Sequence, residues 1–209
     1  MIHWLASLII LAQLIFPFSG HLALQQEEPE IVEPQAHPEF GRQITFQVTV
    51  RPADDVEKVL VYITPAGQPT VWESMPIDEQ GRAALTLDVR RLSLAPFSTI
   101  NYRFEAVLTS GETVSGEPLS FEYNDTRFEW QQKTGGIFQV YWYGGEATLG
   151  QEILNAAEAG LEKSRGLLSV EPPAPIRIYA YTTSRDLQTA LQMASQYWVA
   201  GHASPELGM

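Results

Sequence analysis

The sequence predicts a multi-domain fold, in which an all-β sandwich is followed by part of an α+β domain. Hydrophobic side chains alternate with a period of two through residues 41–123, with turn signals about every 8–12 residues. From residue 136 the pattern changes to strand, helix, strand, helix. A length of 209 residues allows one large domain or two small ones.

Composition indicates an ordered, acidic protein. Hydrophobic residues make up 44% and charged residues 18% of the chain, which is typical of globular domains. The formal net charge is -12. This charge argues against a nucleic-acid partner, because binding to phosphates requires clustered Lys and Arg, and it disfavours docking on an anionic lipid surface. The chain has no cysteine, which excludes disulfides and thiolate metal sites.

Residues 1–20 are predicted to be a signal peptide. The apolar run Trp4–Phe18 has the length of a signal-peptide hydrophobic region and is shorter than the roughly 20 residues that span a bilayer. Ser19 and Gly20 supply small residues near a cleavage point. Because no Lys or Arg precedes the run, an uncleaved signal anchor is the main alternative. We therefore expect an exported protein, extracellular or at the cell surface, that meets a membrane only through this segment.

Residues 21–40 are predicted to be a linker. The stretch Gln25–Pro38 is acidic and rich in proline, with too little apolar surface to fold alone. We interpret it as a semi-extended spacer in front of the first domain.

Residues 41–123 are predicted to form the sandwich. Its strands are expected at Ile44–Val50, Val56–Ile63, Thr70–Met75, Ala84–Val89, Ile100–Leu108, Val114 and Leu119–Tyr123. Six or seven short strands separated by turns are typical of a sandwich of immunoglobulin or fibronectin type. Trp72 lies on a mid-domain strand, where a sandwich can bury an aromatic side chain. The acidic pairs Asp54–Asp55 and Asp78–Glu79 lack the ligand spacing of a calcium loop, so we interpret them as solvated turns.

Residues 124–135 are predicted to connect the sandwich to an α/β unit at residues 136–209. The unit begins with the aromatic strand Ile137–Tyr143. A helix is expected over residues 148–168, where small and apolar side chains recur at helical spacing.

The two expected helices carry boundary signals. Thr148 and Gln151 have the form of a capping box at the start of the first helix. Pro172 and the prolines after it prevent a continuation of that helix, and the strand Ile176–Tyr181 follows. Ser184 is the expected N-cap of the second helix.

The order of these segments resembles a known family. The sequences QVYWY, GLLSVEPPAPIRIYAY, TTSRDLQTAL and WVAGHASPELG follow one another between residues 139 and 208. This order is similar to the N-terminal half of a peptidase MA-like domain, a gluzincin-type zinc metallopeptidase. The resemblance implies a truncated catalytic domain at residues 136–209, preceded by a signal segment and a β-sandwich.

The zinc motif of that family is absent. Such enzymes use H-E-x-x-H on a helix, in which two histidines bind zinc and the glutamate activates water. None of the four histidines, His3, His21, His37 and His202, is followed by Glu. We therefore assign no catalytic, cofactor-binding or metal-binding residue in this chain, and we expect zinc only in a complete family member. We interpret His202 as a loop or packing residue, and we expect the active site beyond Met209.

Two functions follow as hypotheses. In the first, the chain is the exported front portion of a zinc metallopeptidase, inactive alone, whose complete form hydrolyses protein or peptide substrates. In the second, it is a cell-surface binding or structural protein whose sandwich recognises a polymer or a partner. The sequence specifies no oligomeric state.

Overall fold

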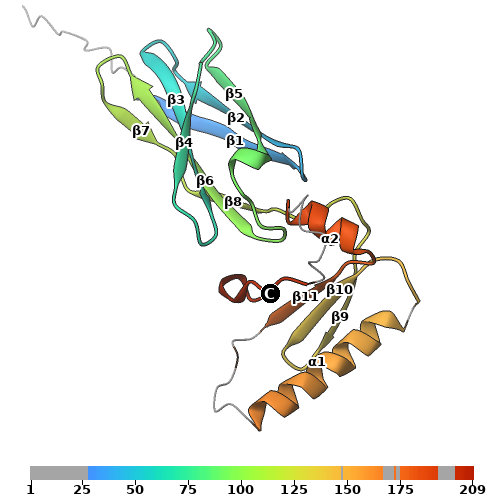
Figure 1. Ribbon diagram of the computed structural model, residues 1–209. Helices are drawn as coiled ribbons and strands as arrows, with labels where there is room; N and C mark the ends of the chain where they lie inside the picture. The colour runs from blue at the N-terminus through green and yellow to red at the C-terminus, as the bar shows by residue number, and fades with distance from the viewer. Residues whose placement is uncertain (1–27, 147, 167–171, 173–174, 193–200) are drawn as a thin grey trace, which may run out of the picture.

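The computed structural model describes residues 28–146, 148–166, 172, 175–192 and 201–209. They form a β-sandwich followed by a smaller α/β unit (Figure 1). The predicted signal segment at residues 1–20 lies outside the described residues. Among the residues that are described, no helix has the length and apolar character needed to cross a membrane.

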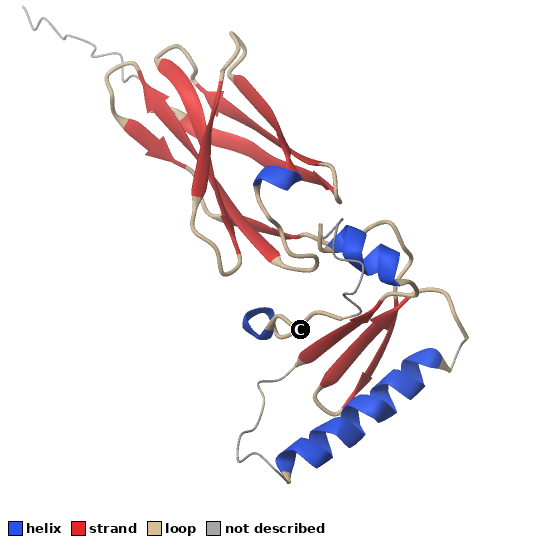
Figure 2. Cartoon of the chain, in the orientation of Figure 1, coloured by secondary structure: helices blue, strands red, loops and turns tan. Residues whose placement is uncertain are grey.

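The sandwich consists of two antiparallel sheets. Its strands are β1 (Glu30–Glu39), β2 (Gln43–Arg51), β3 (Val56–Pro65), β4 (Val71–Met75), β5 (Arg82–Asp88), β6 (Thr99–Leu108), β7 (Thr113–Ser115) and β8 (Leu119–Glu122). One sheet has the order β1-β2-β5, and the other has the order β4-β3-β6-β7, with β8 also pairing with β6. The short 3-10 helix η1 (Val89–Arg91) follows β5. The predicted all-β sandwich is therefore confirmed (Figure 2).

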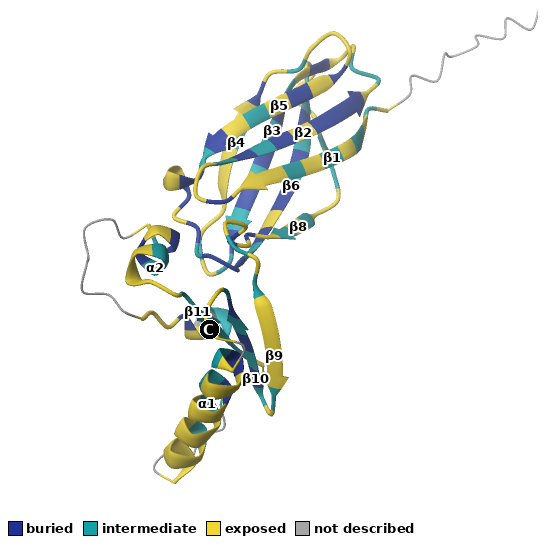
Figure 3. Ribbon diagram, turned by 90° about the vertical axis from the view of Figure 1, so that its right-hand side faces the viewer, coloured by how far each residue is buried: buried dark blue, intermediate teal, exposed yellow. Residues whose placement is uncertain are grey.

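The core of the sandwich comes from the alternation that predicted the strands. Ile44, Phe46 and Val50 of β2 point inward and are fully buried, as are Val59, Val61 and Ile63 of β3. Burial of each large apolar side chain contributes about 1.5–3 kcal/mol. The buried positions lie between the two sheets, whereas the outer faces are exposed (Figure 3).

The predicted linker is wrong for residues 30–39, because they form β1. This strand pairs antiparallel with β2, from Glu30 opposite Arg51 to Glu39 opposite Gln43. Backbone hydrogen bonds to a neighbouring strand need no apolar side chains, and an edge strand tolerates proline. The register is irregular between Val32 and Gln35, where the chain contains a proline. Composition alone could not reveal this pairing, since the partner strand supplies most of the buried surface.

The α/β unit contains a three-stranded sheet of order β11-β10-β9. Its elements are β9 (Gln131–Gly135), β10 (Phe138–Trp142), α1 (Leu149–Arg165), β11 (Ile176–Ala180), α2 (Ser184–Ala190) and the 3-10 helix η2 (Pro205–Leu207). Strands β10 and β11 are parallel, as a strand–helix–strand crossover requires. The predicted strand–helix–strand–helix order is thus found. However, the predicted connector at residues 124–135 is wrong for residues 131–135, which form β9 of this sheet although they carry no apolar side chain.

Both predicted helix caps need correction. Thr148 is the N-cap of α1, but its side chain makes no capping hydrogen bond, so the capping box does not form. In α2 the N-cap is Thr183 and not Ser184, because the Thr183 side chain accepts a hydrogen bond from the Asp186 N–H. Ser is by type the better N-cap of the two, so the residue preference alone favoured the wrong neighbour.

Helix α1 packs closely on one face of the sheet. Phe138, Val140 and Trp142 of β10 form a small core with Leu154 of α1. Gly150, in the first turn of the helix, lies directly against the Trp142 ring, because a Cβ there would be 2.3 Å from the indole.

A methyl group at this contact should destabilise the protein. We expect Gly150→Ala to lower the free energy of unfolding, because overpacking costs about 1–3 kcal/mol. The better helix propensity of alanine offsets at most about 1 kcal/mol of this cost. Urea denaturation followed by circular dichroism measures this loss. Gly160→Ala is the control, because open space surrounds that position of the same helix, and it should stabilise the protein. Equal effects of the two variants would contradict the packing argument.

Candidate functional site

The sheet of the α/β unit has two chemically different faces. One is apolar, with Phe138, Val140 and Trp142 of β10, and lies on α1. The other carries Tyr141 of β10 and Tyr179 of β11, together with Tyr143 and Tyr181, which directly follow these strands, since side chains alternate along a strand. This aromatic face is turned toward the sandwich and α2 (Figure 1).

The sandwich covers the aromatic face with Phe97. The Phe97 ring stacks on Tyr179 with centroids 3.6 Å apart and an interplanar angle of 4°, and Tyr141 stacks against Tyr179 at 4.7 Å. Trp130 lies at the centre of the cluster, with its ring edge-on to Phe97 and to Tyr181 at 5.3 and 5.1 Å. We call this set of rings, with Phe128 and Tyr143, the aromatic junction.

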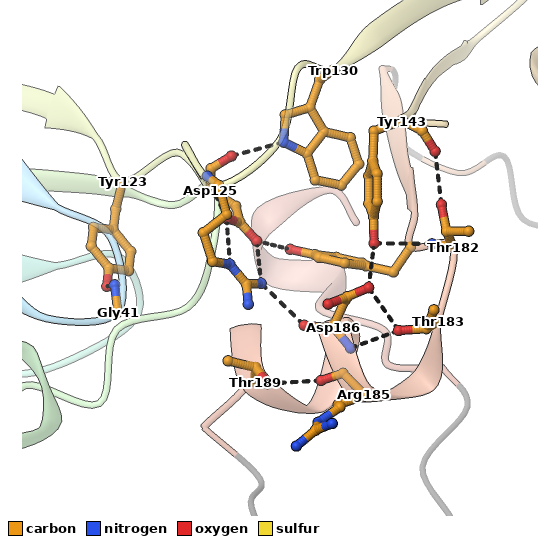
Figure 4. Close-up of polar contacts among 12 residues, drawn as sticks. Gly41, Tyr123, Asp125, Trp130, Tyr143, Thr182, Thr183, Arg185, Asp186 and Thr189 are labelled. Atoms are coloured by element: carbon orange, nitrogen blue, oxygen red, sulfur yellow. Dashed lines mark hydrogen bonds and ion pairs between the residues drawn. The ribbon is translucent and has the colours of Figure 1, made fainter. Parts of the chain in front are cut away.

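A buried carboxylate holds the junction together. Asp125 has a fully buried side chain and forms an ion pair with Arg127, whose Nη2 lies 2.6 Å from Oδ2. Asp125 also accepts hydrogen bonds from Arg127 Nε at 2.8 Å and from the Tyr181 hydroxyl at 2.9 Å. The Trp130 indole donates to the Asp125 carbonyl at 2.8 Å. These bonds connect the end of the sandwich to β11 (Figure 4).

A second carboxylate ties α2 to the same junction. Asp186 accepts hydrogen bonds from the Tyr143 hydroxyl at 2.9 Å and from the Thr183 hydroxyl at 2.6 Å. Its backbone carbonyl accepts a bond from Arg127 Nη2 at 3.1 Å. The hydrogen bond from Thr183 is the main reason why the pKa of Asp186 is lowered. Both carboxylates are thus occupied by structural partners, and the network functions as a lock between the two parts of the chain (Figure 4).

The junction makes stability sensitive to alkaline pH. Burial raises the pKa of Tyr179 to about 12, and burial together with the Asp125 carboxylate raises the pKa of Tyr181. In the unfolded chain these hydroxyls ionise near pH 10. The contribution is therefore fully present below about pH 10 and is lost as the pH rises toward about 12. We expect the urea midpoint to fall as the pH rises from about 10 to about 12, because unfolding releases up to about one proton per buried tyrosine in this range, and we expect Tyr179→Phe to reduce that slope. A midpoint independent of pH in this range would contradict the prediction.

A groove of about 560 Å³ runs beside β11 and the aromatic junction. Its walls include Phe97, Tyr179, Thr183 and His202. The segment that contains His202 turns back onto the start of β11, where the Arg177 N–H and guanidinium donate to the carbonyls of residues 208 and 207 at 2.8 and 2.7 Å. His202 is exposed at the side of this groove, which agrees with the loop role that we expected.

The other residues weighed from sequence do not form a site. His37 is on β1, and its Nε2 lies 3.0 Å from the side-chain oxygen of Gln35. Asp78 organises a turn, because it accepts hydrogen bonds from the backbone N–H groups of residues 80 and 82. These bonds lower the pKa of Asp78, and the bond from the Arg82 N–H has the largest effect. In the described residues no group of three or more His, Asp or Glu side chains could hold a metal ion. His3 and His21 lie outside the described residues.

A row of large polar and aromatic side chains crosses the outer face of the sandwich. Trp72 of β4 pairs with Tyr62 of β3, which pairs with Arg103 of β6. The Arg103 guanidinium lies over the Tyr62 ring, 4.4 Å from its centroid. Trp72 is 61% exposed, so the sandwich does not bury this aromatic side chain. The reason is its register: Trp72 lies opposite Tyr62 on the outer face of an edge strand.

Comparisons with known proteins identify no family. No family model matches the chain, and no curated protein matches it.

Several solved structures share part of the fold at low similarity. A Br derivative of BhCBM56 has a TM-score of 0.33 and 12% identity, over 43% of this chain and 88% of the other. Catalytically inactive OgpA from Akkermansia muciniphila has a TM-score of 0.39 and 17% identity, over 46% of this chain and 28% of OgpA. BC0361, a polysaccharide deacetylase from Bacillus cereus, has a TM-score of 0.35 and 11% identity, over 80% of this chain and 56% of BC0361. At these TM-scores the likenesses carry no argument about function.

Proposed function

We propose that this chain is the exported front portion of a zinc metallopeptidase, in which a sandwich of immunoglobulin or fibronectin type is locked to the N-terminal part of a peptidase MA-like domain. In this proposal the chain alone binds no zinc and hydrolyses no peptide bond, whereas the complete protein acts on a protein or peptide. The sheet β11-β10-β9 is then a scaffold for a catalytic centre that the described residues do not contain.

The aromatic junction is the observation that carries the proposal. Phe97 and Asp125 fix the sandwich to β11 and the residue after it, through a 3.6 Å ring stack on Tyr179 and a 2.9 Å hydrogen bond from the Tyr181 hydroxyl. A tether or spacer would need no such contacts, since flexible linkers suffice to connect independent domains. A rigid joint is useful where an element must be held in place for precise chemistry. The strand–helix–strand–helix order of the unit also agrees with the family resemblance.

Two measurements test this function together. The coding sequence beyond Met209 should contain H-E-x-x-H on a predicted helix. The purified chain, incubated with zinc and desalted, should retain less than about one tenth of an equivalent of zinc, as expected for a chain without a closed ligand set, and it should not cleave a casein substrate. Stoichiometric zinc or casein cleavage by this chain, or a downstream sequence without the motif, would overturn the proposal.

The exposed row of Trp72, Tyr62 and Arg103 favours a second function. Trp, Tyr and Arg are the residue types that contribute most to binding energy at interfaces, and an exposed Trp on a flat sheet offers a stacking surface. On this alternative the chain is a cell-surface protein whose sandwich binds a polymer.

Co-sedimentation with insoluble polysaccharides tests the alternative. We expect the wild-type chain to be retained by one of a panel of cell-wall polysaccharides, and Trp72→Ala to reduce retention about tenfold, as loss of one good aromatic contact does. Val71→Ala is the matched control, since Val71 is the neighbouring exposed side chain on the same strand. Equal retention of all three proteins would refute a role for this row.

A further inference from the structure

A hollow of about 660 Å³ is lined by residues of the sandwich, of the connector and of α2. Its lining is Phe40, Gly41, Arg90, Arg127, Arg185, Gln188, Thr189 and Gln192. Three of these side chains are arginines and none is acidic. In a chain with a net charge of -12 and 13 Lys and Arg in total, three arginines around one hollow bring several guanidinium donors together, and such donors suit carboxylate and phosphate oxygens.

Two of the arginines are held in place by carboxylates and keep N–H donors that these carboxylates do not use. Arg127 binds Asp125 through Nε and Nη2, and its guanidinium lies 5.3 Å from the ring centroid of Phe40. Arg90 binds Asp88 through Nε and Nη2. Within the described part of the chain, the Nη1 group of each makes no hydrogen bond. Two guanidinium groups are therefore fixed by carboxylates that are not part of the lining.

The third arginine is not neutralised by an ion pair. The guanidinium of Arg185, on α2, has no hydrogen-bond or ion-pair partner among the described residues, although Arg185 lies next to Asp186 in sequence and lowers its pKa. Its backbone carbonyl accepts from the Thr189 hydroxyl at 2.8 Å. Among the described residues, the lining thus combines the guanidinium of Arg185, which has no polar partner there, with two partly occupied guanidinium groups, and it also contains amide and hydroxyl side chains.

We propose that this hollow is a binding site for a small oxyanion with two or more negative charges, carrying phosphate or carboxylate groups. The planar fork of arginine matches both groups, and the volume suits a small molecule. Arg90 belongs to the sandwich, Arg127 to the connector and Arg185 to α2. A bound anion therefore joins the two parts of the chain across the hollow and reinforces the lock made by Asp125. This site is independent of the proposed metallopeptidase function.

Thermal unfolding of the full chain in the presence of defined anions tests the site. Pyrophosphate and citrate are titrated to 20 mM, each against sodium chloride at matched ionic strength. A ligand that binds only the folded state raises Tm, by about 3–6 °C at a tenfold excess over its Kd. We expect a rise that grows with the logarithm of the anion concentration above Kd for at least one of the two anions, and none with chloride. A rise with pyrophosphate alone assigns a phosphate ligand, and one with citrate alone assigns a carboxylate ligand.

Arginine variants with the same charge change provide the control. Arg185→Gln should weaken the apparent Kd about tenfold or more, the effect of losing one charged hydrogen bond. Arg165→Gln, on the exposed surface of α1, should bind as the wild type does. A Tm rise that is the same in Arg185→Gln and wild type, or that follows ionic strength alone, would overturn the proposal.

Discussion

Replacement of Asp125 by alanine is expected to lower the free energy of unfolding by about 3–5 kcal/mol, because it leaves a buried charge without its partner. The carboxylate is fully buried, whereas the Arg127 side chain is 28% exposed. The variant also leaves the Tyr181 hydroxyl without its acceptor. A loss of this size is a large part of the 5–15 kcal/mol that stabilises a typical domain. Urea unfolding followed by tryptophan fluorescence measures it.

Two controls separate the buried charge from other effects. Glu57→Ala removes an exposed pair with Lys58, whose atoms lie 3.4 Å apart, and it should change stability by less than about 1 kcal/mol. The double variant Asp125→Ala with Arg127→Ala should be more stable than the sum of the single variants, since it removes the unpaired guanidinium. An effect of Asp125→Ala no larger than that of Glu57→Ala would show that the ion pair does not hold the junction.

The sequence predicted those strands in which apolar and polar side chains alternate, because this alternation shows which face of the strand is buried. Ile44, Phe46 and Val50 alternate with polar residues, so β2 was found with its buried face. The two strands that were missed, β1 and β9, are edge strands rich in polar residues, and β1 also contains two prolines. Their positions depend on the backbone groups of a neighbouring strand, and a period-two search for apolar residues cannot detect that.

The aromatic junction was missed for a different reason. Tyr179 and Tyr181 were visible as part of a strand, and Phe97 lies in a loop of the sandwich more than eighty residues earlier. Nothing in the local sequence connects them. One signal was present: an alternation that places aromatics on the second face of a sheet predicts that something apolar covers it. The three arginines that line the hollow come from η1, from the connector and from α2, so only the fold brings them together.

The sandwich and the α/β unit should become uncoupled when Phe97 is replaced by alanine. Phe97 is 5% exposed and has a φ of 59°, a conformation that is strained for a bulky side chain. The stack on Tyr179 and the contact with Trp130 offset this strain. Loss of a buried Phe side chain costs about 3–5 kcal/mol, and here the cost falls on the junction. We expect hydrogen exchange to accelerate in β10 and β11, while β2 and β3, whose core lies between the two sheets, stay protected.

Phe97→Leu and Trp72→Ala make the result interpretable. Phe97→Leu keeps most of the apolar volume, so it should accelerate exchange in β11 less than Phe97→Ala does. Trp72→Ala removes a larger ring from an exposed position and should leave exchange unchanged in both parts. If Phe97→Ala instead accelerates exchange equally in β2 and in β11, the two parts unfold as one cooperative unit. If it accelerates exchange in neither part, the stack on Tyr179 contributes nothing to the joint, and the proposed role of the sandwich as a rigid support fails with it.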